Sequence, residues 1–189
     1  KKPVKQYINY EAAQANCTAI DWENYVAPVP AFTGTKIFAD YDLNEIRTFI
    51  DWKPFFIAWE LHGNFPQILT DEKVGVEATK LYNDANALLD KIIAEKGITA
   101  HGVIGFWQAN TLAPDTIGVK KGDSVVRLES LRQQIKKAPG QPNLSLADFV
   151  APVESGKIDY CGGFATTGGI GIEKWKDQYR ADHNDYKAI

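Results

Sequence analysis

The most regular hydrophobic pattern of the chain lies between residues 71 and 96. Apolar residues recur there at alternating steps of four and three, at Val74, Ala78, Leu81, Ala85, Leu88 and Ile92. This spacing predicts an amphipathic helix from Asp71 to Lys96 that packs one face against the core. A coiled-coil seam would need more heptads than this segment contains. Gly97 stands where a left-handed residue is expected to end the helix.

A dense aromatic run, Asp51–Leu61, follows neither the alternation of a strand nor the spacing of a helix. Pro54 is expected to interrupt the run and to hold Lys53 in an extended conformation. We therefore expect a buried corner of the core at this point. Asp51, which heads the run, must be hydrogen-bonded or reach water, because burying an unpaired carboxylate is costly. It is expected either to cap a turn or to receive the hydroxyls or ammonium group of a small ligand.

The rest of the chain predicts short helices and antiparallel strands. The first forty residues carry prolines and predict an irregular arm with one short helix. Apolar runs on both sides of a Lys-Gly-Asp turn predict a hairpin, and hence antiparallel pairing. The predicted helices lie at 11–16, at 43–50 with a cap among residues 40–42 and Asp51 closing it, and from 172 through Tyr186. The predicted strands lie at 102–107, 116–120, 124–131 and 159–167.

Composition limits the classes of function. With 189 residues, of which 44% are hydrophobic, the chain is expected to form one compact domain without metal or disulfide support. A net charge of -3 with scattered Lys and Arg residues argues against nucleic-acid binding. No apolar run approaches the roughly 18 residues of a membrane span, and the first residues do not resemble a signal peptide. A cytoplasmic protein is expected, and the absence of Met predicts a processed chain or a segment of a longer one.

Residue types that bind metals are too far apart in the sequence to predict a site. Cys17 and Cys161 form no CxxC pair and are expected to be free thiols. His62, His101 and His183 lack metal-binding spacing and are expected to be surface or packing residues.

Catalytic motifs are equally scarce. The cluster Thr167–Gly171 lacks the third glycine of a dinucleotide-binding loop and the Lys-Ser/Thr of a P-loop, so a structural turn is the favoured interpretation. No serine lies in a GxSxG elbow. A hydrolase that pairs two of Asp51, Asp148 and Asp159 would need two carboxyl groups held at a productive separation, which nothing else in the sequence favours.

Several blocks, in register from about Ile20 to Ile189, resemble one family: the reactivation domain of cobalamin-dependent methionine synthase. The blocks are Ile20–Tyr25 with Pro28–Pro30, Asp51–Phe56, Gly102–Phe106, Arg132–Gln134, Leu146–Pro152, Ser155–Tyr160 and His183–Tyr186. The resemblance implies an α+β fold: a C-shaped single domain with a bent antiparallel sheet flanked by helices. Residues 1–189 would be the N-terminal portion of this activation domain, truncated at its C-terminal side, with residues 1–19 as a linker or arm.

The resemblance also implies a function in methionine biosynthesis. In that family S-adenosylmethionine binds this domain and methylates cobalamin held by the cobalamin-binding domain of the same chain, which rescues inactive cob(II)alamin. A flavodoxin-type or related reductase supplies the electron. The whole enzyme is a methyltransferase between 5-methyltetrahydrofolate and homocysteine, with its zinc site in another module. This segment alone is not expected to be catalytic, since the transfer needs two oriented cofactors and no protein nucleophile.

The resemblance assigns few ligand-binding residues to this chain. Asp51 matches an acid of the family that contacts S-adenosylmethionine. Glu173 lies near an acidic position associated with docking against the cobalamin domain, but a solvated acid on a helix is the favoured interpretation of this residue. The family's main S-adenosylmethionine motif, Arg-x-x-x-Gly-Tyr, does not occur in residues 1–189. Most of the ligand site is therefore expected to lie outside them. The alternative is a docking or structural fragment that has lost S-adenosylmethionine binding.

Overall fold

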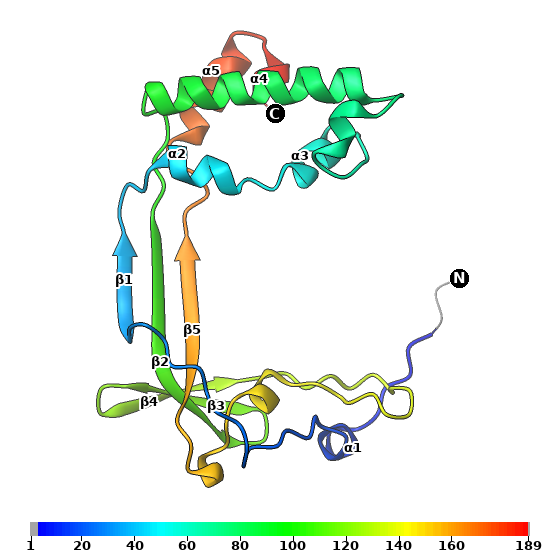
Figure 1. Ribbon diagram of the computed structural model, residues 1–189, viewed down its shortest axis with the longest axis vertical. Coiled ribbons are helices and arrows are strands. Elements are labelled where there is room, and N and C mark those ends of the chain that lie inside the picture. Colours follow the sequence, from blue (N-terminus) through cyan, green and yellow to red (C-terminus); the bar gives the residue numbers. More distant parts are fainter. Residues whose placement is uncertain (1–3, 189) are drawn as a thin grey trace. The chain divides into compact units, whose positions relative to one another are not determined.

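The computed structural model describes residues 4–188, which fall into two compact units (Figure 1). The hairpin unit contains the chain up to Lys36 together with Ile104–Phe164, and the helical unit contains Ile37–Val103 together with the chain from Ala165 onward. Each unit therefore combines segments that are far apart in the sequence.

An antiparallel sheet of five strands connects these segments. The strands are β1 (Gly34–Phe38), β2 (Gly102–Ala113), β3 (Thr116–Lys121), β4 (Ser124–Glu129) and β5 (Asp159–Thr166). Their order is β1-β2-β3-β4, and β5 also pairs with β2. The predicted α+β class with an antiparallel sheet is confirmed. The strand predicted at 102–107 continues to Ala113, and β1 lies where an irregular arm was expected.

The predicted hairpin is the β3–β4 pair. Lys121 is opposite Ser124, which leaves Gly122 and Asp123 as a two-residue turn. Gly122 has φ +59°, a conformation that glycine adopts without steric cost. The core beside the hairpin is made by Ala109, Ile117, Val119 and Ala147.

Short helical segments complete the hairpin unit. Helix α1 (Tyr10–Ala15) confirms the short helix predicted in the arm, and the Asn9 side chain caps it by accepting a hydrogen bond from the Ala12 N–H. Two 3₁₀ turns, Leu146–Phe149 and Val153–Ser155, precede β5.

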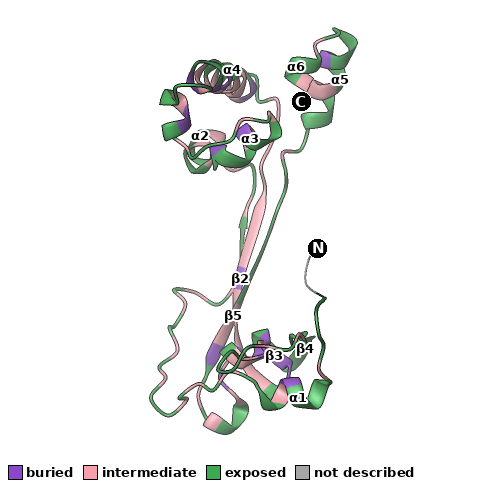
Figure 2. Ribbon diagram, turned by 90° about the vertical axis from the view of Figure 1, so that its right-hand side faces the viewer, coloured by how far each residue is buried: buried purple, intermediate pink, exposed green. Residues whose placement is uncertain are grey.

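The helical unit is built around one long helix. Its elements are α2 (Leu43–Ile46) with a 3₁₀ turn at Arg47–Phe49, α3 (Trp52–Ala58), a 3₁₀ turn at Gln67–Thr70, α4 (Gly75–Ala94), α5 (Ile172–Ala181) and α6 (Asp185–Ala188). Figure 2 shows buried positions on α3 and α4. The core consists of Trp52, Phe56, Ile68, Ala78 and Leu81. This confirms that α4 packs one apolar face on the core.

The aromatic run is a helix, so the expectation that Pro54 interrupts it was wrong. Pro54 is the third residue of α3, and Lys53 is helical rather than extended. The first turn of a helix has no internal acceptors for its N–H groups, so a proline there removes no hydrogen bond. Asp51 was expected to close the preceding helix; instead that helix ends earlier and Asp51 begins α3.

The end of α4 also differs from the prediction. Lys96, not Gly97, has the left-handed conformation, with φ +48°. The Gly97 N–H donates to Ile92 O at 2.8 Å and the Lys96 N–H to Ile93 O at 3.2 Å, which is the Schellman pattern. A side chain at Gly97 would overlap the indole of Trp175. Close packing therefore requires this glycine.

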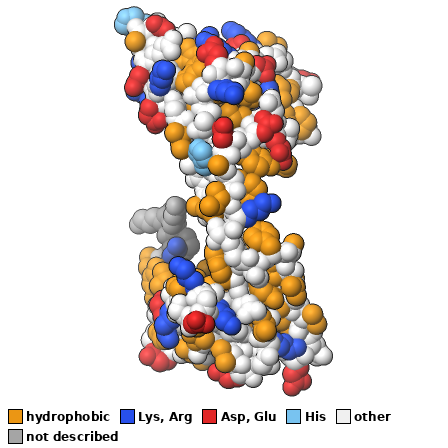
Figure 3. Space-filling model, turned by 90° about the vertical axis from the view of Figure 1, so that its left-hand side faces the viewer, with side chains coloured by type: hydrophobic (Ala, Val, Ile, Leu, Met, Phe, Trp, Pro, Cys, Tyr) orange, Lys and Arg blue, Asp and Glu red, His pale blue; other side chains and the backbone are white. Residues whose placement is uncertain are grey.

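The predicted single C-terminal helix is two helices. His183, with φ +54°, ends α5 in the same pattern, and the Asn184 N–H donates to Tyr179 O at 2.8 Å. The chain then starts α6 at Asp185. No helix among residues 4–188 has both the length and the apolar character to cross a bilayer. On the face shown in Figure 3, basic and acidic side chains are interspersed.

Candidate functional site

Asp51 is the N-cap of helix α3. Its Oδ1 accepts a hydrogen bond from the Lys53 N–H at 3.0 Å, and the residue is exposed. The other carboxylate oxygen makes no hydrogen bond within the described residues. Both interpretations of Asp51 from the sequence remain compatible with this geometry, because one oxygen caps the helix and the other is available to a ligand.

The position of Asp51 is set by the core beneath it. Trp52 is 9% exposed and Phe56 is fully buried, so α3 is held against α4 by the face that carries these two residues. Lys53, next to the acid, donates from Nζ to Asn64 Oδ1 at 3.0 Å. Asp51 is therefore a charged group at the start of a firmly packed helix.

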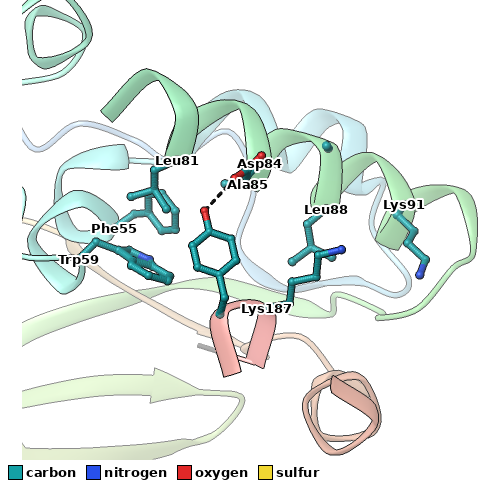
Figure 4. Close-up of a pocket in the computed structure, with 10 residues that line it drawn as sticks. Phe55, Trp59, Leu81, Asp84, Ala85, Leu88, Lys91 and Lys187 are labelled. Carbon is teal, nitrogen blue, oxygen red and sulfur yellow. Dashed lines mark hydrogen bonds between the residues drawn. The ribbon is translucent and has the colours of Figure 1, made fainter. Parts of the chain in front are cut away.

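A second stripe of α3 lines a pocket of about 220 Å³ (Figure 4). Phe55 and Trp59 follow Asp51 at steps of four residues, and they form one wall of the pocket. The remaining lining residues come from α4 and α6: Leu81, Asp84, Ala85, Ala87, Leu88, Lys91, Tyr186 and Lys187. Asp51 is not among them, so the candidate acid and the pocket share a helix but do not form one site.

The polar groups of the pocket are paired. The Tyr186 hydroxyl donates to Asp84 Oδ2 at 2.8 Å, and the Tyr186 ring lies 5.0 Å from the ring of Trp59. Burial and the bond to Asp84 both raise the pKa of Tyr186. Lys91 Nζ lies 5.2 Å from the ring centroid of Trp175. The pocket is thus an apolar groove in which Tyr186 and Asp84 bond to each other and Lys91 lies beside Trp175, so its polar groups do not converge on one point.

The other candidate acids have structural roles. Asp148 accepts two bonds from the guanidinium of Arg132, at 2.9 and 2.6 Å, and one from the Ser145 N–H at 3.0 Å. Asp159 accepts from the N–H groups of Ala151 and Tyr160 at 3.0 and 2.8 Å. Each carboxylate is committed to holding its own loop, which removes support for a hydrolase that uses them as an acid–base pair.

The glycine cluster before α5 forms a turn, as the sequence favoured. Gly169 and Gly171 have φ +92° and +102°, and Ile170 between them forms a β-bridge with Thr99. A Cβ on Gly171 would approach Gly97 O to 2.9 Å. Glu173, in the first turn of α5, is exposed.

Cysteine and histidine side chains do not gather. Cys17 and Cys161 are free thiols, as expected. Nδ1 of His101 accepts from the Asp40 N–H at 3.1 Å, His62 is exposed, and His183 ends α5. Within residues 4–188, no group of three or more His, Cys, Asp or Glu side chains could hold a metal ion.

Sequence reasoning missed a buried charge cluster in the hairpin unit. Arg132 lies between Asp115 and Asp148, with all three side chains at most 8% exposed. The only signal in the sequence was that Arg132 and Asp148 fall in two separate blocks of the family resemblance. Spacings of 16 and 17 residues match no helix or strand period.

Comparison with known families identifies the chain. Residues 42–189 match the family model of the vitamin B12 dependent methionine synthase activation domain. The chain belongs to this family. A crystal structure of the MetH reactivation domain bound to AdoHcy is 42% identical, with a TM-score of 0.89, and the match covers 96% of this chain and 56% of that one. The chain therefore spans little more than half the length of that relative.

Proposed function

We propose that this activation-domain chain binds S-adenosylmethionine and supports the reductive methylation of cobalamin in a methionine synthase. The observation that carries the proposal is the likeness to a reactivation domain bound to AdoHcy, S-adenosylhomocysteine, which is S-adenosylmethionine without its transferable methyl group. Such a likeness at 42% identity extends to side chains as well as to the backbone.

Asp51 is the ligand-binding residue that we assign in this chain. S-adenosylmethionine carries a sulfonium and an ammonium group as well as ribose hydroxyls, and a carboxylate can bind each of them. The unpaired oxygen of Asp51 is exposed to solvent, while its other oxygen keeps the side chain fixed on α3. The fixed position lowers the entropy that the side chain loses when a ligand binds.

The chemistry requires little else of this part of the protein. Cobalamin, held by a neighbouring domain of the parent chain, would supply the metal that accepts the methyl group, and a flavodoxin-type or related reductase would supply the electron. The task left to this chain is to hold and orient the methyl donor. A cytoplasmic location fits this proposal.

The alternative is a docking or structural fragment without S-adenosylmethionine binding. One observation favours it: residues 1–189 contain no Arg-x-x-x-Gly-Tyr motif. A titration decides between the two functions.

The test is calorimetric titration of S-adenosylmethionine into the 189-residue chain and into Asp51→Asn. Asparagine keeps the capping oxygen but removes the charge, so a loss of affinity would report on the ligand and not on the helix. Asp42→Asn is the matched control, because Asp42 caps α2 through an equivalent bond to the Asn44 N–H at 2.8 Å. We expect saturable binding that Asp51→Asn weakens about tenfold or more and that Asp42→Asn leaves unchanged. Absence of binding by the unsubstituted 189-residue chain would overturn the proposal.

A further inference from the structure

The N-terminal segment Tyr7–Asn16 lies outside the part of the chain that the family model matches. It contains α1, and the residues before α1 pair with a strand-like stretch of the hairpin unit. The Ile8 N–H donates to Gln134 O and the Lys136 N–H donates to Gln6 O, both at 2.9 Å. Backbone bonds thus join this segment to residues about 130 positions later.

Tyr10 attaches one end of α1 to the buried charge cluster. Its hydroxyl donates to Asp115 Oδ2 at 2.5 Å. The same carboxylate pairs with Arg132, at 2.7 Å, and Arg132 also pairs with Asp148 at 2.6 Å. The Tyr10 hydroxyl therefore joins the N-terminal segment to a buried ionic network.

Asn16 attaches the other end of α1. Its Nδ2 donates to Gln141 O at 3.0 Å and to Asn143 Oδ1 at 2.7 Å, and its backbone oxygen accepts from the Asn143 N–H at 2.7 Å. Asn143 is fully buried, and its own Nδ2 donates to Gln133 O and Ile135 O. The two ends of α1 thus bond to different parts of the hairpin unit, Tyr10 to Asp115 and Asn16 to the stretch that contains Asn143.

Little apolar surface supports these bonds. Tyr7 is 70% exposed and Tyr10 is 41% exposed, and Ala13 is the buried residue of α1. Since helices of this length are not stable alone, α1 depends on its attachments for its structure. Loss of one polar attachment therefore has a large effect on whether the segment remains bound.

We infer that Tyr7–Asn16 is a separately detachable segment, held to the rest of the hairpin unit by Tyr10 at one end and Asn16 at the other. The ten residues span at most about 35 Å when extended. A domain joined to this side of the segment gains part of that reach when the segment detaches, and its effective concentration at the hairpin unit falls. In the proposed function, this would regulate how a neighbouring domain of the parent chain approaches.

The test is amide hydrogen exchange, followed by NMR, on the 189-residue chain and on Tyr10→Phe. Phenylalanine keeps the ring but cannot donate to Asp115. The reporters are the amides of Ile8, Lys136 and Asn143, whose hydrogen bonds join residues 6–16 to residues 134–143. We expect their exchange rates to rise about tenfold or more in the variant, since hydrogen bonds to charged groups are the strong ones.

Two further variants make the result specific. Tyr41→Phe removes a chemically similar bond, from the Tyr41 hydroxyl to Glu45 Oε1 at 2.7 Å, within one turn of the helical unit, and it should leave the reporters unchanged. Asn16→Ala should accelerate the same three amides from the other end of α1. The inference is overturned if Tyr10→Phe leaves the reporters unchanged, or if amides of β3 accelerate equally, since the segment would then not detach separately. Neither result depends on whether S-adenosylmethionine binds.

Discussion

Replacing Arg132 by methionine tests the buried charge cluster of the hairpin unit. Methionine keeps an unbranched apolar stem but is shorter and carries no charge, so the variant leaves Asp115 and Asp148 buried without their cation. The Arg132 side chain is 2% exposed and each aspartate side chain is 8% exposed, so water cannot readily replace the guanidinium. The hydrogen bonds to Asp148 raise the pKa of Arg132 above its usual range, although burial opposes this, so Arg132 is charged in the native cluster.

The expected cost follows from the two carboxylates left behind. Removing one partner of a buried ion pair costs about 3–5 kcal/mol, because an uncompensated charge remains in a poorly solvated site. Arg132→Met also removes the bond from Nη1 to Asn143 O, 2.7 Å long. We therefore expect a loss at the upper end of this range in the free energy of unfolding of the hairpin unit.

The assay must resolve the two units. Urea unfolding followed by hydrogen-exchange mass spectrometry gives separate midpoints for peptides of β3 and of α4. The matched control is Arg47→Met, which breaks an ion pair with Asp90 whose side chains are 26% and 66% exposed and which should cost at most about 1 kcal/mol. A loss below about 1 kcal/mol for Arg132→Met would refute the reasoning, since the carboxylates would then be solvated or neutral.

Two further predictions concern the end of α4. Gly97→Ala should destabilise the helical unit by about 1–3 kcal/mol, because the new methyl group overlaps the Trp175 indole. Its control is Gly168→Ala, where a methyl group meets no atom within 4 Å and the melting temperature should hardly change. Lys96→Gly should instead stabilise the same unit by about 0.5–1 kcal/mol, because only glycine adopts φ +48° without strain. A lower melting temperature for Lys96→Gly would show that the lysine side chain contributes more than its strained backbone costs.

Elements defined by local patterns could be predicted from the sequence. The apolar period of α4 and the turn at Gly122 depend on neighbouring residues alone, and both were confirmed. Helix α3 could not be recognised, since it places Trp52 and Phe56 in the core while Phe55 and Trp59 line a pocket. Because this short helix is apolar on two faces, its apolar residues do not recur with the spacing by which a helix is recognised.

Helix ends were misjudged for a different reason. Intrinsic preference assigns the left-handed position to glycine, yet Glu60, Lys96 and His183 occupy it at the ends of α3, α4 and α5. Carbonyl groups in the last turn accept hydrogen bonds there, and these bonds offset the strain. Tertiary packing explains why Gly97 follows one of them.

Only part of the candidate site could be predicted from the sequence. The position of a carboxylate at the head of an apolar run predicted a cap or a ligand contact for Asp51, and the structure confirms the cap. Its assignment to S-adenosylmethionine came from family resemblance and stays a prediction. The cluster around Arg132 depends on chain segments that meet only in the folded protein, so no local pattern could show it.

The most direct test of the central claim is an NMR titration of the isotope-labelled 189-residue chain with S-adenosylmethionine. The account predicts saturable shifts centred on the amides of Trp52 and Lys53, next to Asp51, which disappear in Asp51→Asn. An absence of shifts, or saturable shifts confined to the hairpin unit, would contradict the assignment of Asp51 to the methyl donor.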